Sequence, residues 1–160
     1  MKYLLSIFIL FLCFQGFCQD NQLVQDYQNL NLKGMQVLLG WSVLNITTGS
    51  AGNFLSEGES RYFYQMNAGW NLVNAGLAIY GLHNFSQELD LQDFPSQFEQ
   101  TKKLYLINAG LDVAYIAGGI YMMTRSNIRT RGYGQSIALQ GMFLLVFDAI
   151  MYYLNQKLDF

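Results

Sequence analysis

A chain of 160 residues is long enough for one domain. Hydrophobic residues make up 52% of the chain and charged residues only 12%, which is about half the charge usual in soluble domains. The formal net charge of −2 provides no basic surface, which excludes a nucleic-acid-binding protein. The composition indicates long apolar segments, which are taken below in chain order.

The first segment, "MKYLLSIFILFLCFQGFCQD", has the pattern of a secretory signal peptide. Lys2 supplies a short positive region and residues 3–14 form an apolar core. Gly16 and Cys18 are the small residues that a signal peptidase requires at positions −3 and −1 of its cleavage site. We therefore expect cleavage after Cys18, and the alternative is an uncleaved first helix.

Cleavage divides the chain into a signal peptide, residues 1–18, and a mature domain, residues 19–160. The mature domain then contains no thiol, because Cys13 and Cys18 both lie in the signal peptide. This excludes disulfides, thiolate metal sites and cysteine catalysis. His83 is the one histidine and cannot form a zinc or haem site of a known kind alone. We expect no metal, no cofactor and, without a nucleophile–base arrangement, no enzyme.

Four segments of the mature domain are candidates for crossing a bilayer, which takes about 20 mostly apolar residues. They cover approximately residues 34–51, 62–83, 104–124 and 137–154. Only helices and closed barrels satisfy their backbone hydrogen bonds in lipid, and the two-residue alternation of strands is absent here. We therefore expect an all-α fold, a four-transmembrane-helix antiparallel bundle. A soluble helical bundle is the alternative.

Two patterns predict helical structure ahead of these spans. Leu23, Tyr27 and Leu30 form an apolar stripe in a polar segment, which predicts that the first helix starts early, as a short amphipathic lead-in at the membrane surface or against the bundle. Ser96 and Glu99 have the spacing of a capping box just after the single proline. The third helix is therefore expected to begin before its span.

Export places the mature N-terminus on the outer side of the cell membrane, and four crossings return the C-terminus to that side. We expect a multi-pass inner-membrane protein in contact with membrane lipids. The positive charges divide equally between the two sides, so the orientation depends on the cluster Arg125, Arg129 and Arg131 on the inner side. These arginines act as a topology signal or contact anionic lipid headgroups.

Polar residues recur within the apolar spans at helical spacing. Asn67 and Asn71 share one helical face, while Asn108, Asp112 and Tyr115 share another. Polar side chains in membrane helices turn toward the bundle interior. We therefore predict a polar seam, which is also the possible binding site, formed by Asn45, Asn67, Asn71, Asn74, Asn108, Asp112, Gln140 and Asp148.

Small residues beside the polar seam predict close approach of the helices. Gly110, Ala114 and Gly118 recur at a spacing of four, and Gly69 and Gly76 lie in the preceding span. Such small residues let the backbones of membrane helices pack closely.

The spans also show an internal sequence similarity. "NAGWNLVNAGLAIY" at residues 67–80 matches "NAGLDVAYIAGGIY" at residues 108–121. Aligning all four spans places one polar residue per helix in a single column: Ser42, Asn71, Asp112 and Asp148. Two explanations of this similarity are open: an ancient duplication, or convergence on the small and polar residues that pack membrane helices.

The two aspartates lie at similar depth. Counted at about 1.5 Å per residue, Asp112 and Asp148 reach nearly the same level on neighbouring antiparallel helices. An ionised aspartate in such a place costs roughly 2.5–3.5 kcal/mol, and no lysine or arginine lies in any span. We therefore expect at least one of the two carboxyls to be protonated at neutral pH.

Four sequence stretches carry a resemblance to a known family: "KGMQVLLGWSVLN", "YFYQMNAGWN", "LINAGLDVAYIAGGIYMM" and "GYGQSIALQGMFLLVFDAIMYYL". They cover nearly all of the mature domain, and the "NAGLD" and "FD" motifs are the most distinctive. The chain resembles a family of small, uncharacterised, exported four-span bacterial membrane proteins that is classed as a domain of unknown function. The resemblance implies fold and location and no activity.

Two functions of different classes are consistent with these patterns. In the first, the chain is a structural or accessory membrane protein, as a homo-oligomer or in a larger membrane complex, and the polar seam holds its helices together. In the second, the chain is a small transporter or a ligand- or proton-binding membrane protein that uses Asp112 and Asp148. Replacing both aspartates by asparagine discriminates the two functions.

Overall fold

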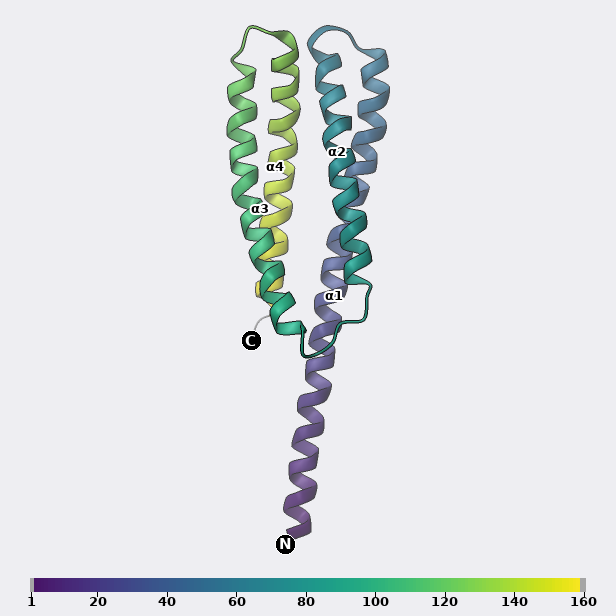
Figure 1. The fold of residues 1–160 in the computed structure, drawn as a ribbon, viewed down its shortest axis with the longest axis vertical. Helices are drawn as coiled ribbons and strands as arrows, with labels where there is room; N and C mark the ends of the chain where they lie inside the picture. Colours follow the sequence, from purple (N-terminus) through teal and green to yellow (C-terminus); the bar gives the residue numbers. More distant parts are fainter. Residues whose placement is uncertain (1, 159–160) are drawn as a thin grey trace.

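A computed structural model describes the backbone of residues 2–158 and the side chains of residues 21–158. This part of the chain forms four α-helices and no strand, which confirms the all-α prediction. The helices are α1 (Lys2–Leu55), α2 (Gly58–Phe85), α3 (Phe94–Met123) and α4 (Ile128–Gln156). Figure 1 shows two antiparallel hairpins side by side, α1–α2 and α3–α4, with the N-terminal part of α1 extending beyond them.

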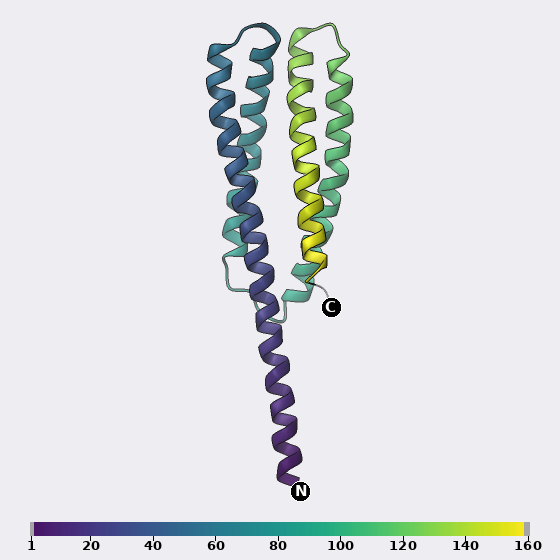
Figure 2. The same ribbon diagram turned by 180° about the vertical axis from the view of Figure 1, so that it is seen from behind.

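The two hairpins meet through α2 and α4. α1 packs mainly on α2, α3 packs mainly on α4, and α2 lies against α4. The connections 56–57 and 124–127 lie at one end of the bundle, while the connection 86–93 and the C-terminal end of α4 lie at the other (Figure 2). α2 and α4 therefore run parallel to each other, which places residues far apart in the sequence at the same level.

Local signals set the helix ends. Gly58 has a φ of 61°, a left-handed conformation that glycine adopts readily and that permits the short turn between α1 and α2. Pro95 lies in the first turn of α3, where its missing amide hydrogen leaves no bond unmade. Asn127 caps α4, because its Oδ1 accepts from the backbone amides of Arg129 at 2.9 Å and Thr130 at 3.3 Å.

The first helix continues without a break through the segments that the sequence separates. The backbone of residues 2–18 is the start of α1, and their side chains lie outside the described residues, so cleavage of the signal peptide stays a prediction. The predicted early start of the first helix is confirmed, because the lead-in is continuous with the rest of α1. Its Tyr27 and Val24 are buried against Phe94 and Phe98 at the start of α3.

The contact between the two early helix segments includes a buried hydrogen bond. The Tyr27 hydroxyl lies 2.8 Å from Oγ1 of Thr101. Burial raises the pKa of this hydroxyl above the ordinary 10.0, and the hydrogen bond to Thr101 lowers it in part. The predicted early start of the third helix is confirmed, since α3 begins at Phe94.

Polar residues lie inside the bundle and apolar residues lie on its surface. Six polar side chains are 0% exposed: Asn31, Ser42, Asn71, Ser136, Gln140 and Asn155. On all four helices, large apolar side chains are more than half exposed, among them Val43, Leu72, Leu106 and Val146. Among the described residues, thirteen buried side chains are polar or charged and eleven are apolar, whereas the buried residues of a water-soluble domain are mostly apolar.

Two of the described helices, α3 and α4, are long and apolar enough to cross a membrane. The first two predicted spans lie in α1 and α2, which do not meet the same requirement for mean hydropathy. Asparagines on the inner face of α2, such as Asn67, Asn71 and Asn74, lower its mean hydropathy. The structure therefore supports membrane-crossing capacity for the third and fourth predicted spans.

Candidate functional site

The structure buries seven of the eight residues predicted for the polar seam: Asn45, Asn67, Asn71, Asn74, Asp112, Gln140 and Asp148. The eighth, Asn108, is exposed, so its place in the seam is wrong. α3 turns a narrow stripe inward, with buried residues seven apart at Phe98, Tyr105, Asp112 and Gly119. Asn108 falls just beside this stripe, as does Tyr115, which is 38% exposed.

The first part of the seam joins three helices through Gln140 of α4. Its Oε1 accepts from the indole Nε1 of Trp41 at 2.9 Å, and its Nε2 donates to Oδ1 of Asn67. Asn67 Nδ2 in turn donates to Oδ1 of Asn45 at 3.0 Å. Trp41 also stacks on Phe143, with ring centroids 3.8 Å apart. These bonds fix the registers of α1 and α2 against α4.

A second polar cluster lies nearer the other end of the bundle and was not predicted from the sequence. Asn31 Nδ2 donates to Oδ1 of Asn155 at 3.0 Å, and the Tyr105 hydroxyl donates to Oδ1 of Asn31 at 2.9 Å. Both asparagines lie just outside the predicted spans, so the search for polar residues within the spans missed them. Spacing could have found them, because Asn31 follows Tyr27 by one helical turn and Asn155 follows Asp148 by two.

The third part of the seam is the pair Asp112 and Asp148, which are 3% and 5% exposed. The two side chains lie close together between α3 and α4, near enough for their carboxyl groups to interact. Two ionised carboxylates are acceptors only, so a hydrogen bond between them requires that one carboxyl keeps its proton. No lysine or arginine occurs in residues 104–124 or 132–156 to neutralise a second charge.

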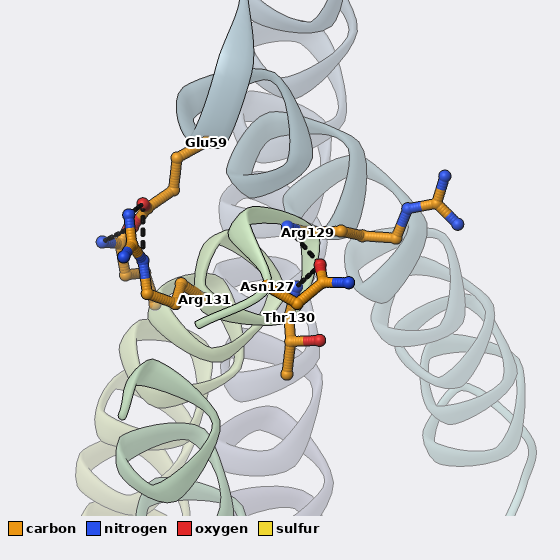
Figure 3. Close-up of polar contacts among 6 residues, drawn as sticks. Glu59, Asn127, Arg129, Thr130 and Arg131 are labelled. Carbon is orange, nitrogen blue, oxygen red and sulfur yellow. Dashed lines mark hydrogen bonds and ion pairs between the residues drawn. The ribbon is translucent and has the colours of Figure 1, made fainter. Parts of the chain in front are cut away.

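The three predicted headgroup arginines lie at the end of the bundle that carries the short connections, and Arg131 is engaged within the protein. Its guanidinium forms an ion pair with Glu59 of α2, with Nε 2.8 Å from Oε2, and Gln135 donates to Oε1 of the same carboxylate at 2.7 Å. Figure 3 shows Arg131 turned toward Glu59 and Arg129 turned away from it. Arg131 therefore ties α4 to α2.

The other two arginines are exposed and lie over tyrosine rings. The Arg129 guanidinium is 5.2 Å from the Tyr62 ring centroid, and that of Arg125 is 4.3 Å from the Tyr121 ring centroid. Such cation–π contacts contribute about 0.5–1 kcal/mol at exposed sites. Arg125 and Arg129 thus remain accessible at the bundle end for anionic groups, whereas Arg131 has its counterion.

Glycines do bring the helices together, but not the ones predicted. The predicted residues are exposed: Gly69, Gly76, Gly110, Ala114 and Gly118. The closest helix contact between α3 and α4 instead uses Gly119, where an added Cβ would lie 2.6 Å from the backbone nitrogen of Ala138 and 2.7 Å from the carbonyl oxygen of Gly134. The inward stripe of α3 therefore passes through Gly119, next to the predicted Gly118.

A family model described as a family of unknown function, DUF6992, matches residues 37–149. The chain belongs to the DUF6992 family. The match covers the C-terminal third of α1, most of α4 and the whole of α2 and α3, so it contains the Gln140 cluster and the aspartate pair. It leaves out the Asn31–Asn155 cluster. No curated protein and no solved structure matches the chain. The resemblance to an uncharacterised family is thus confirmed, and membership in DUF6992 assigns no activity.

Proposed function

We propose that this DUF6992 protein is a four-span integral protein of the cell membrane with a structural or accessory role and no catalytic activity. The observation that carries the proposal is the polarity of the bundle, because polar residues make up half of its buried side chains while large apolar side chains are exposed on all four helices. Lipid solvates such a surface, whereas water does not. In water this surface would promote aggregation.

The distribution of charge supports all four crossings, including those of α1 and α2. Each predicted span lies in a long stretch without charged residues, apart from Asp112 in the third and Asp148 in the fourth: residues 34–56, 62–87, 104–124 and 132–156. At about 1.5 Å per residue the shortest stretch spans about 31 Å, which matches a hydrocarbon core of about 30 Å. The charged residues collect at the two ends of the bundle, where the headgroups would lie.

The orientation and the role follow from the same features. The bundle end with Arg61, Arg125, Arg129 and Arg131 faces the inner side, and both termini of the mature chain face the outer side. The polar seam holds the helices together, with each interhelical hydrogen bond worth about 0.6 kcal/mol on average. A bundle held in this way suits a scaffold in lipid, as a homo-oligomer or as part of a larger membrane complex.

Lysine substitution at two exposed leucines tests the membrane assignment. Leu72, near the middle of α2, is 62% exposed, and Leu55, at the end of α1, is 86% exposed. In the proposed arrangement Leu72→Lys places a charge at the bilayer centre, which costs about 2.5–3.5 kcal/mol and lowers the amount of protein that resists alkaline extraction from membranes. The control Leu55→Lys leaves that amount unchanged.

A water-soluble bundle gives the opposite outcome, because a lysine at an exposed position is harmless in water. Leu72→Lys would then match Leu55→Lys, and alkaline carbonate would release both variants and the wild type from the membrane fraction. That result would remove the proposal for α2.

A second candidate function, favoured by the contact of the two carboxyls, is a small transporter or a proton- or ligand-binding membrane protein. Carboxyl pairs buried in a membrane occur in proton relays and polar ligand sites. The variant that carries both Asp112→Asn and Asp148→Asn separates the two functions. Loss of proton flux in liposomes with the bundle intact supports transport, whereas unchanged assembly without any flux in the wild type supports the structural role.

A further inference from the structure

Four buried polar atoms in the part of the chain with described side chains have no hydrogen-bond partner, and three of them lie near one level. The four atoms are Asn71 Oδ1, Asn74 Nδ2, Asp112 Oδ2 and Ser136 Oγ. The four side chains are between 0% and 5% exposed. An unsatisfied buried polar atom costs about 1–3 kcal/mol, and ordered water usually satisfies such groups. These atoms therefore point to a small polar occupant.

The registers of the helices bring three of these atoms together with Asp148. Gln140 of α4 hydrogen-bonds Asn67 of α2, and two turns further along these parallel helices Asn74 lies level with residue 147, beside Asp148. α3 reaches the same level, because Asp112 contacts Asp148. Ser136 lies about three turns away and is not part of this level.

Two further contacts agree with this placement. The rings of Trp70 in α2 and Tyr115 in α3 have centroids 4.9 Å apart. Asn71 and Asp112 lie within one turn of these two residues, so they are at a similar height in the bundle. In α1, Ser42 is fully buried between Asn45, which pairs with Asn67, and Met35, which packs on Gly81. The column of Ser42, Asn71, Asp112 and Asp148 in the aligned spans thus falls within about one and a half helical turns of the bundle.

We propose that Asn71, Asn74, Asp112 and Asp148, the buried acid layer, bind one proton between the two carboxyls together with at least one water molecule. The unpaired atoms include an acceptor, Asn71 Oδ1, and a donor, Asn74 Nδ2. Water offers both donors and an acceptor, whereas a bare metal cation accepts only electron pairs and would leave the amide donor unpaired. A water molecule that links these amides to Asp112 Oδ2 satisfies all three atoms.

Few other titratable groups face the buried acid layer. Tyr105 of α3 is close enough to Asp148 to interact with it electrostatically. α1 and α2 face the layer with Ser42, Asn71 and Asn74, none of which titrates. The proton therefore belongs to the carboxyl pair itself. The inference deepens the second candidate function above, but a bound proton does not require transport.

Infrared spectroscopy of the full chain in detergent micelles at neutral pH tests the proton. The wild type is expected to show the carbonyl stretch of a protonated carboxylic acid, and the variant with both Asp112→Asn and Asp148→Asn is expected to lose it. The control Asp26→Asn, at an exposed aspartate, keeps the signal. Absence of the acid signal in the wild type, or its persistence in the double variant, overturns the proposal.

Transfer of the wild type into D2O tests the water. A hydrated acid exchanges its proton at once, so its carbonyl signal shifts on mixing. The variant with both Asn71→Leu and Asn74→Leu displaces the water and is expected to keep the acid signal while its shift slows. If that variant does not fold, the wild-type shift alone decides. A signal that stays unshifted for hours means that no water contacts the carboxyl pair, which overturns the proposed water molecule.

A proton flux measurement on the same samples separates this inference from transport. An acid signal without flux keeps this inference and removes the transport function.

Discussion

The contact between Gly119 and its neighbours in α4 gives the sharpest prediction about packing. A Cβ at position 119 would lie 2.6 Å from the backbone nitrogen of Ala138 and 2.7 Å from the carbonyl oxygen of Gly134. Ordinary contact begins at 3.4 Å, so Gly119→Ala must move α3 and α4 apart by about 0.8 Å. Backbone atoms cannot turn aside as a flexible side chain can, so the whole helix contact must open.

The size of the effect follows from overpacking, which typically costs 1–3 kcal/mol. The neighbouring glycine supplies a matched control, because nothing lies within 4 Å of a Cβ added at Gly118. Gly118→Ala is expected to stabilise the helix by roughly 0.5–1 kcal/mol, since alanine loses less conformational freedom on folding. The two substitutions, one residue apart, are therefore expected to change the free energy of unfolding in opposite directions.

The assay is thermal unfolding of the full chain in one detergent, followed by the helical circular dichroism signal. The unfolding midpoint is expected to be highest for Gly118→Ala, intermediate for the wild type and lowest for Gly119→Ala. Equal midpoints for the two variants, or a more stable Gly119→Ala, would refute the assigned rotation of α3.

Three further predictions concern the hydrogen bonds. Gln140→Leu leaves the buried Asn67 Oδ1 and the half-buried Trp41 Nε1 without this partner and is expected to cost about 1–3 kcal/mol in the same unfolding assay, against no change for the exposed control Gln156→Leu. Arg131→Gln removes a partly exposed ion pair with Glu59 and is expected to cost at most about 1 kcal/mol. The difference in stability between the wild type and this variant is expected to shrink as salt is raised. Because burial raises the pKa of Tyr27, the wild type keeps the full contribution of this hydroxyl below pH 10 and loses it as the pH rises further. Tyr27→Phe is expected to cost about 1 kcal/mol at neutral pH and to reduce the loss of stability at alkaline pH.

The sequence predicted the helices and most of the polar seam because both depend on local periodicity. Asn67, Asn71 and Asn74 interrupt an apolar run at the spacing of one helical face, and the structure buries all three. Asp112 and Asp148 lie at the same depth because antiparallel neighbours with short turns must align their ends. Neither conclusion requires knowledge of how a helix is rotated about its axis.

What depends on rotation could not be predicted. The inward stripe of α3 contains Gly119 and Asp112 and excludes Gly118 and Asn108, although each excluded residue lies within about 100° of an included one. Packing against α4 decides between these neighbouring faces, and no pattern within α3 records it. The polar residues at the ends of the spans were also missed, because hydropathy marks the apolar stretch while polar residues such as Asn31 extend the helix beyond it.

The most direct test of the four-span arrangement is the accessibility of single cysteines to a membrane-impermeant maleimide in spheroplasts of expressing bacteria. With Cys13 and Cys18 replaced by alanine, Ser60→Cys and Ser126→Cys report one end of the bundle and Ser86→Cys reports the other. The account predicts labelling at position 86 in intact spheroplasts, and labelling at positions 60 and 126 only after lysis. If position 60 is labelled together with position 86 while 126 stays protected, only α3 and α4 cross the membrane, and the four-span account is contradicted.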